Sequence, residues 1–346
     1  MKKTGRISLA ALLSSSMVLA ACGGGDDQDA AGDGGDIGRI SIYSPETPDM
    51  TREMAEKFEE IHGGQVDVNY AGTNVLVNQM IAEMDNPQAD LWYGGGGILP
   101  FESAIEHGFI ESYTPELAED WDVVQDDIKV RHEDWKWVGV EVFALGLIYN
   151  TDLVDEDELP QTWDELLDPR WEDELQMPNP AASGTATLFV ISQLQDKGEE
   201  EGWDYLDSLV GQMNSMPDSG GAPAQAAASG EASMGIGFDF MAYQMKDRGE
   251  SVDFHIPDNT PILVNPVALI KDGPNPEGAQ KFVDFMLSEE GQQIKADWFH
   301  IPMHPDVEGK SELTMEDLNE VAQDLDIDWV VENYDEIRQS WRDRYQ

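Results

Sequence analysis

Short runs of glycine, serine, threonine and aspartate separate predicted strands from the helices that follow them at five places. These are residues 44–47, 94–97, 183–185 and 219–221, and the neighbourhood of Asp239. Because a helix N-terminus carries free N–H groups and a partial positive charge, such junctions can bind an anion. Each junction alone is also what an ordinary helix N-cap requires, so a site needs several of them to converge.

The elements that must position these junctions alternate between strand and helix. Residues 40–43 alternate like a strand, and apolar residues then recur at helical spacing from Met50 to Ile61. Further strands are predicted at 66–70, 89–93, 143–149, 175–177, 213–216, 232–238 and 262–270, and helices include 74–84 and 275–298. This order favours an α/β sheet, in which ligands bind at the carboxyl ends of the strands. The junctions could therefore converge on one cleft.

The first 21 residues are typical of a secretory signal peptide. A basic start that contains Lys2, Lys3 and Arg6 precedes an apolar stretch at 7–20, which is too short to span a bilayer. The alternative is an amphipathic N-terminal helix of a cytosolic protein. The serine run and the lack of a polar face disfavour it.

Cys22 follows this signal and is the only cysteine in the chain. The sequence LAAC at 19–22 resembles the bacterial lipobox, which implies that Cys22 becomes the N-terminus and carries a lipid. Lipidation accounts for a lone cysteine better than a free thiol does. Residues 22–37 are mainly glycine and aspartate and are predicted to form a flexible acidic tether. The spacing of a calcium loop is absent from it.

Acidic residues outnumber basic ones by 70 to 20, and the net charge is −50. Such a surface repels nucleic acid and anionic headgroups, so neither is an expected partner. The charges repel one another at low salt and are screened at high salt, which predicts a halophilic or saline source. The acids are spread over the whole chain, which disfavours a dedicated site for cationic ligands.

Signatures of catalysis and of cofactors are missing from the sequence. It contains no G-x-S-x-G elbow, no phosphate loop and no H-E-x-x-H, and its six histidines are scattered. We therefore predict a protein that is not an enzyme and has neither a cofactor nor a resident metal. An exported hydrolase and a structural lipoprotein remain the alternatives from other classes.

Several motifs along the mature chain resemble family-1 extracellular solute-binding proteins of ABC importers, in the branch that contains ferric-ion-binding proteins. Each motif is weak alone, but their order and spacing together are specific. They are YSP at 43–45, NPQADLWYGGG at 86–96, GLIYNT at 146–151, TWDELLDPRW at 162–171, ASGT at 182–185, ASGE at 228–231, PNPE at 274–277 and FVDFMLSEEGQ at 282–292.

The resemblance implies a two-lobed periplasmic-binding-protein type II fold, in which each lobe is a mixed α/β sheet flanked by helices. The expected division is a signal peptide at 1–21, a tether at 22–37, lobe 1 at 38–142 with 263–300, and lobe 2 at 143–262 with 301–346. Hinges are expected near 141–146 and 261–266. The implied partners are an ABC permease and its ATPase. The protein would be a monomer, in the periplasm or on the outer face of the cytoplasmic membrane, anchored through Cys22.

The ferric-binding pattern is not kept where the resemblance places its ligands. The positions of the family's histidine, glutamate and tyrosine pair are occupied here by Thr47, Gly95, Asp239 and Phe240. The family's anion-binding element is kept at 183–185, with a second element at 220–221. The resemblance therefore implies a small organic anion such as a phosphonate, a sugar phosphate or another phosphoester, with ferric iron as the alternative.

Asp239 has two interpretations, a hydrogen-bond partner of the ligand or a plain helix cap. The candidate ligand-binding residues are Ser44, Thr47, Gly95, Gly96, Ser183, Gly184, Thr185, Gly220, Gly221 and Asp239.

Overall fold

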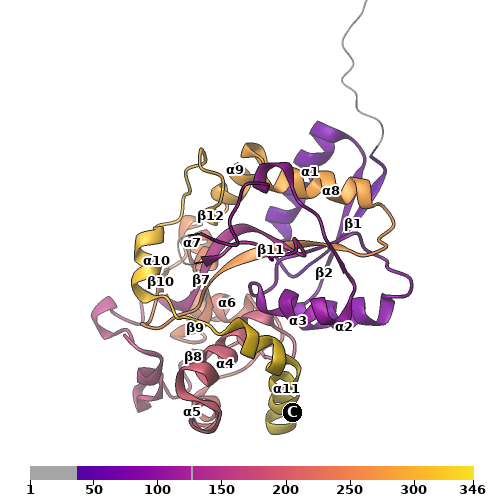
Figure 1. The fold of residues 1–346 in the computed structure, drawn as a ribbon. Helices are drawn as coiled ribbons and strands as arrows, with labels where there is room; N and C mark the ends of the chain where they lie inside the picture. The colour runs from indigo at the N-terminus through magenta and orange to yellow at the C-terminus, as the bar shows by residue number, and fades with distance from the viewer. Residues whose placement is uncertain (1–36, 126–127) are drawn as a thin grey trace, which may run out of the picture. The chain divides into compact units, whose positions relative to one another are not determined.

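The computed structural model describes residues 37–125 and 128–346 (Figure 1). The predicted signal peptide, Cys22 and nearly all of the predicted tether lie outside these residues. Residues Asp36–Gln346 form one compact unit. No helix among the described residues is long and apolar enough to cross a membrane.

A mixed sheet of ten strands runs through this unit, which confirms the predicted α/β class, but residues 213–216, predicted as a strand, form only an isolated bridge between Ser215 and Gln176. Its main path has the order β2-β1-β3-β11-β7-β9-β8. Strand β1 is parallel to β2 and β3, whereas β11 is antiparallel to β3 and β7. The strands are β1 Arg39–Ser44, β2 Gln65–Tyr70, β3 Leu91–Tyr93, β4 Ile110–Glu111, β7 Val138–Asn150, β8 Leu175–Gln176, β9 Met234–Phe238, β10 Val252–His255, β11 Ile262–Ile270 and β12 Ile301–Pro302, with β5 Val124–Gln125 and β6 Ile128–Lys129 in a separate pair.

Helices cover the sheet on both faces. Around β1 to β3, Figure 1 shows α1 and α8 on one side of the strands and α2 and α3 on the other. The α-helices are α1 Pro48–His62, α2 Thr73–Glu83, α3 Leu99–His107, α4 Gly184–Lys197, α5 Glu199–Gln212, α6 Ala222–Ser229, α7 Asp239–Asp247, α8 Pro276–Leu287, α9 Glu289–Asp297, α10 Met315–Val321 and α11 Ile327–Tyr345. Short 3-10 helices span Glu116–Ala118, Glu156–Glu158, Trp163–Leu167 and Pro169–Trp171.

The single helix predicted at 275–298 is two helices in the structure, α8 and α9. Ser288 separates them in an extended conformation, and its hydroxyl accepts a hydrogen bond from the N–H of Gly291. Serine favours such a cap over a helix interior because its side chain competes for backbone hydrogen bonds. The apolar spacing continues through the break, so periodicity alone predicted one helix.

Strand β7 is buried along its whole length and changes neighbours halfway. Residues 138–144 pair with β11, and residues 145–149 pair with β9. The exchange lies within the predicted hinge at 141–146. Strand β11 shifts register between Asn265 and Pro266, at the end of the second predicted hinge.

The C-terminal stretch contacts elements from both predicted lobes. Strand β12 pairs with Glu141 and Val142 of β7. Helix α11 packs against α3 as well as α4, and it buries Tyr334 and Trp341. The prediction grouped residues 301–346 with the second lobe only. It did not include the contacts that this stretch makes with β7 and α3.

Candidate ligand-binding site

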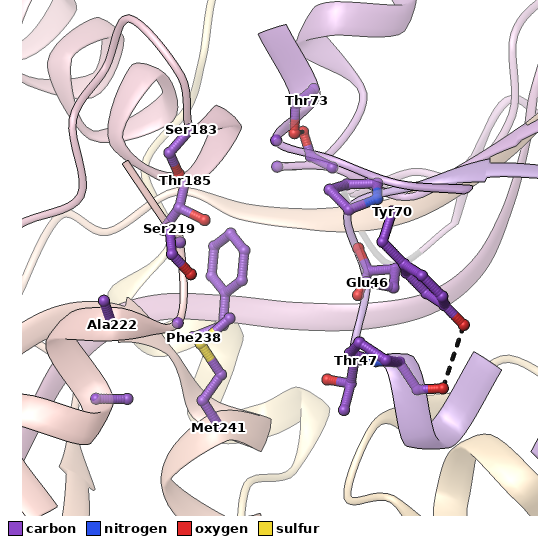
Figure 2. A pocket seen from close by; sticks show the side chains of 18 of the residues that line it. Glu46, Thr47, Tyr70, Thr73, Ser183, Thr185, Ser219, Ala222, Phe238 and Met241 are labelled. Carbon is purple, nitrogen blue, oxygen red and sulfur yellow. Dashed lines mark hydrogen bonds between the residues drawn. The ribbon is translucent and has the colours of Figure 1, made fainter. Parts of the chain in front are cut away.

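A cavity of about 680 Å³ opens where several strand-to-helix junctions meet. One wall is formed by the residues that follow β1, β2 and β3. The facing wall comes from the N-terminal ends of α4, α6 and α7. Figure 2 shows Ser183, Thr185 and Ser219 across the cavity from Glu46 and Thr73. Sheet topology explains the convergence, because the carboxyl ends of parallel strands lie at one edge.

Seven of the ten candidate residues line this cavity, although they were selected from junctions far apart in the sequence. They are Thr47, Gly95, Gly96, Ser183, Thr185, Gly220 and Gly221.

The hydroxyls of Ser183, Thr185 and Ser219 gather on one wall of the cavity, and we call these three residues the hydroxyl cluster. Ser183 and Thr185 are buried in the protein, and Ser183 makes no side-chain cap bond to its own helix. Within residues 37–125 and 128–346, no protein group forms a hydrogen bond with any of the three hydroxyls. Buried polar groups normally have a partner, so this cluster is suited to a ligand that accepts hydrogen bonds.

Gly220 keeps the space beside the hydroxyl cluster open. A Cβ atom at this position would lie 3.3 Å from Oγ of Ser183 and 3.5 Å from Oγ1 of Thr185. The next residues begin α6, while α4 begins at Gly184 and α2 at Thr73. The N-termini of α2, α4 and α6, together with those of α1 and α7, therefore border the cavity, and each adds a partial positive charge.

The remaining candidates, Ser44, Gly184 and Asp239, do not line the cavity. Ser44 is fully buried, and its Oγ accepts a hydrogen bond of 3.1 Å from the N–H of Glu46. A Cβ atom at Gly184 would overlap the carbonyl oxygen of Gly95, so Gly184 allows two backbone segments to touch.

Asp239 is fully buried as the first residue of α7, whose N-cap is Phe238, so its carboxylate is not the N-cap of this helix. Its Oδ1 accepts a hydrogen bond of 3.2 Å from the N–H of Ala144 on β7. Its Oδ2 has no partner among the described residues. Burial raises the pKa of Asp239 to about 7, although the backbone hydrogen bonds from Ala144 and Phe240 act to lower it.

Sequence reasoning missed several residues that line the cavity. The junction after β2, which supplies Tyr70, Gly72 and Thr73, was overlooked because Thr73 lies inside the helix rather than before it. An apolar section of the wall was also missed. Its members are Phe238, Phe240, Met241 and Met245.

Glu46 is the acidic residue of the wall formed by the β1 junction, and it is 9% exposed. Burial and then the charge of Glu141 raise the pKa of Glu46 to about 7, although Asn265, Lys295 and the N–H of Gly95 act in the opposite direction. A Cβ atom at Gly94 would overlap the carboxylate, and Gly94 has a φ of 78°. Glycine at 94 therefore leaves room for this carboxylate.

A fully buried ion pair lies behind Glu46. Nζ of Lys295 is 2.5 Å from Oε2 of Glu141, and both side chains are 0% exposed. The Tyr93 hydroxyl and the Asn265 amide donate to the other carboxylate oxygen at 2.8 and 2.7 Å. Burial works against ionisation of Glu141, but the nearby charge of Lys295 outweighs it and holds the pKa of Glu141 below its usual value.

Asn265 connects this ion pair to the cavity wall. Its Oδ1 accepts a hydrogen bond of 3.2 Å from the N–H of Gly95. His300 completes the buried group, with Nδ1 3.7 Å from Glu141 and its ring stacked on Phe240 at 4.1 Å. Burial lowers the pKa of His300 to about 4, so its imidazole is neutral at pH 7.

Residues 100–329 match the family model described as "Bacterial extracellular solute-binding protein". The chain is 25% identical over 304 residues to the probable ABC transporter periplasmic-binding protein y4fP of Sinorhizobium fredii, which covers 84% of this chain and 81% of that protein. It is 26% identical over 286 residues to iron uptake protein A1 of Synechocystis sp., which covers 76% of this chain and 74% of that protein.

The structure is similar to that of the periplasmic binding protein AfuA from Actinobacillus pleuropneumoniae, solved with exogenous fructose-6-phosphate bound. The TM-score is 0.80 at 27% sequence identity, and the match covers 88% of this chain and 98% of AfuA.

Proposed function

The chain belongs to the bacterial extracellular solute-binding proteins, and we propose that it captures a small anionic organic solute in the cavity described above. It is the periplasmic solute-binding component of an ABC transporter. Its fold is the two-lobed mixed α/β fold of periplasmic binding proteins. The proposed solute is a phosphonate, a sugar phosphate or a similar phosphoester, which the protein delivers to the permease and ATPase without chemical change.

The observation that carries this proposal is the hydroxyl cluster beside Gly220. Three hydroxyls without partners among the described residues face the cavity, beside the N-termini of α2, α4 and α6. A phosphoryl or phosphonyl group offers three acceptor oxygens and negative charge, which matches hydroxyl donors and helix N-termini. The complex of AfuA with fructose-6-phosphate gives a precedent in a similar protein.

An anionic solute is compatible with a chain whose net charge is −50. Oriented N–H groups and hydroxyls act at short range inside a dehydrated cavity, whereas the exterior charges are screened by salt. Arg248 adds a positive side chain to the lining.

Ferric iron is the second candidate, because iron uptake protein A1 is among the relatives. The cavity offers the carboxylates of Glu46 and Asp218 and the phenol of Tyr70. Oδ1 of Asp218 already accepts from Nδ2 of Asn179 at 2.8 Å. The phenol lies 2.6 Å from Oγ1 of Thr51 and donates to the carbonyl of Pro48 at 3.2 Å. Among the described residues, no group of three histidine, cysteine, aspartate or glutamate side chains could hold a metal.

We also propose that the lobes close on the solute by bending of β7 and β11. Strand β7 exchanges its neighbours at residues 144 and 145, and β11 changes register nearby, so few backbone dihedrals would need to change. The proposed lobes keep the predicted bounds of 38–142 with 263–300 and 143–262 with 301–346. The mature protein would be a monomer, held to the membrane by a lipid on Cys22 and a flexible tether.

A ligand panel tests the proposal by thermal unfolding and calorimetry. The probes are 2-aminoethylphosphonate, fructose 6-phosphate, inorganic phosphate and ferric citrate. A true ligand at 100 times its Kd should stabilise the protein by about 2.7 kcal/mol, and it should be recovered unchanged. A tight complex with iron and with none of the organic anions would overturn the proposed solute class.

The variant Ser183→Ala links this result to the hydroxyl cluster. Because the Ser183 hydroxyl makes no cap bond, its loss should leave the ligand-free melting temperature nearly unchanged. Affinity for the best anionic probe should fall by about tenfold, the equivalent of one charge-assisted hydrogen bond. Ser208→Ala on the exposed side of α5 is the matched control.

A further inference from the structure

We propose that Glu46 forms a second subsite, which selects solutes carrying a hydrogen-bond donor, best an ammonium group, at the end opposite the anion. This inference rests on the proposed function and narrows its solute class to bifunctional molecules. It assigns a specificity role to a residue in the wall that faces the hydroxyl cluster (Figure 2).

The first step is the balance of charge around Glu46. Two carboxylates, Glu46 and Glu141, share this buried region with one ammonium, that of Lys295. Lys295 forms its ion pair with Glu141, and His300 is neutral at pH 7. Among the described residues Glu46 has no ion-pair partner, so its negative charge is left uncompensated.

The second step is that a buried carboxylate without a cation is costly. It must take up a proton, or a cation must come from outside the protein. Glu46 lines the cavity, so a solute can reach it. An ammonium group there would restore the balance of two carboxylates and two cations. A hydroxyl would donate a hydrogen bond without supplying the charge.

The third step is that the local structure holds Glu46 in place. The Ser44 hydroxyl accepts a hydrogen bond from the N–H of Glu46, and Gly94 leaves space for the carboxylate. The Asn265 amide and the N–H of Gly95 lie close enough to its carboxyl group to lower its pKa, while they donate to Glu141 and to Oδ1 of Asn265 respectively. These contacts restrict the carboxylate before any solute arrives, and preorganisation of this kind favours selective binding.

The fourth step is the separation of the two chemistries. The hydroxyl cluster belongs to the wall built by α4 and α6, and Glu46 belongs to the wall that follows β1 (Figure 2). The apolar residues Phe238 and Met241 line the cavity as well, where the carbon skeleton of a solute could lie. A zwitterion with an anion at one end and an ammonium at the other fits this arrangement.

The test compares three phosphonates that differ at one position. These are 2-aminoethylphosphonate, 2-hydroxyethylphosphonate and n-propylphosphonate, which carry an ammonium, a hydroxyl and a methyl group. The affinities are measured by calorimetry at pH 7.5, a chosen condition about half a unit above the pKa of Glu46, so that its carboxylate is mostly ionised. For the wild-type protein, affinity should fall in the order given. The affinity for the amine should exceed that for the methyl compound by about tenfold or more. Glucosamine 6-phosphate and glucose 6-phosphate form a second pair, in which the amine should again bind more tightly.

The variant Glu46→Gln should remove the preference for the amine while it keeps binding of the hydroxyl compound. Glu56→Gln is the matched control, because it deletes the same charge from the exposed face of the adjacent helix α1. Circular dichroism and the ligand-free melting temperature verify that both variants are folded.

Equal affinities of the wild type for the amine and the methyl compound would refute the subsite and leave the anion site intact. An unchanged or stronger preference for the amine in Glu46→Gln would also refute it. That result would fit a protonated Glu46 that donates to the anion. If none of the probes binds to the wild type, the proposed function itself fails, and the two failures are therefore distinguishable.

Discussion

Gly220 is the residue at which the shape of the proposed anion site can be tested most directly. Its φ is outside the left-handed region, so a side chain can be added without backbone strain. The variant Gly220→Val would place methyl groups against Ser183 and Thr185 and fill the space of the anion. We expect affinity for the best anionic probe to fall by about a hundredfold, with a melting temperature close to that of the wild type.

Gly211→Val provides the control for this substitution. Gly211 lies in α5 and also has ordinary backbone geometry, and a Cβ atom added there would meet no other atom within 4 Å. Calorimetry on both variants should show loss of binding in Gly220→Val alone. Retained affinity in that variant would mean that the anion lies elsewhere in the cavity.

Asp239 allows a prediction about stability and pH. Its pKa is about 7 in the folded protein and 3.8 in the unfolded chain, so the folded state holds the proton more tightly. The stabilisation from this proton is complete below about pH 4 and is lost as the pH rises to about 7, at about 1.4 kcal/mol per pH unit. Asp239→Asn keeps an oxygen for the N–H of Ala144 and cannot ionise.

Urea unfolding from pH 4.5 to pH 8 (a chosen range that brackets the titration of Asp239) checks this prediction. The wild type should lose stability with rising pH, and Asp239→Asn should lose less, by roughly 2–4 kcal/mol over the range. The exposed Asp247→Asn in the same helix should follow the wild type. Parallel curves for all three proteins would contradict a raised pKa at Asp239.

At the scale of elements, Asn74 joins segments from the two proposed lobes. Its Nδ2 donates to the carbonyl of Pro180 at 2.9 Å and to Oγ1 of Thr187 at 3.1 Å. Its Oδ1 accepts from the hydroxyl of Tyr334 in α11 at 3.3 Å. If β7 and β11 act as hinges, the bonds between α2 and residues 180–187 exist only when the lobes are closed.

Asn74→Ala should therefore weaken ligand binding by about tenfold, because closure loses hydrogen bonds that the open form never makes. The ligand-free melting temperature should change less than the ligand-bound one. Tyr334→Phe removes the bond to α11 alone, so its effect on affinity should be smaller. A fall in stability that is equal with and without ligand would identify Asn74 as a structural residue independent of closure.

Local sequence signals identified most of the strand and helix junctions, because glycine, serine and threonine mark them wherever they occur. They could not identify the neighbours of Glu46. Glu141, Lys295 and His300 are at least 95 positions away in the sequence, and their burial together depends on how β7, α9 and β12 pack. The same limit applies to α11, whose contact with α3 has no local sequence signature.

At the scale of the whole molecule, the chain has 70 acidic and 20 basic residues, and this excess of negative charge determines how binding should respond to salt. Each exposed carboxylate contributes to a negative potential that opposes the approach of an anion. Salt shortens the range of this potential from a Debye length of about 10 Å at 0.1 M to about 3 Å at 1 M. The hydroxyl cluster and the helix N-termini act over shorter distances and are less affected.

Affinity for an anionic probe should therefore rise with sodium chloride between those two concentrations, chiefly through a faster association rate. Stopped-flow fluorescence of the intrinsic tryptophans would measure the rate, and the melting temperature of the ligand-free protein should rise in parallel as repulsion weakens. Sucrose, which does not screen charge, is the control. In a protein whose anion site relies on long-range attraction, salt would lower affinity. That result would show that exposed cations such as Arg248, rather than hydroxyls and backbone N–H groups, hold the anion.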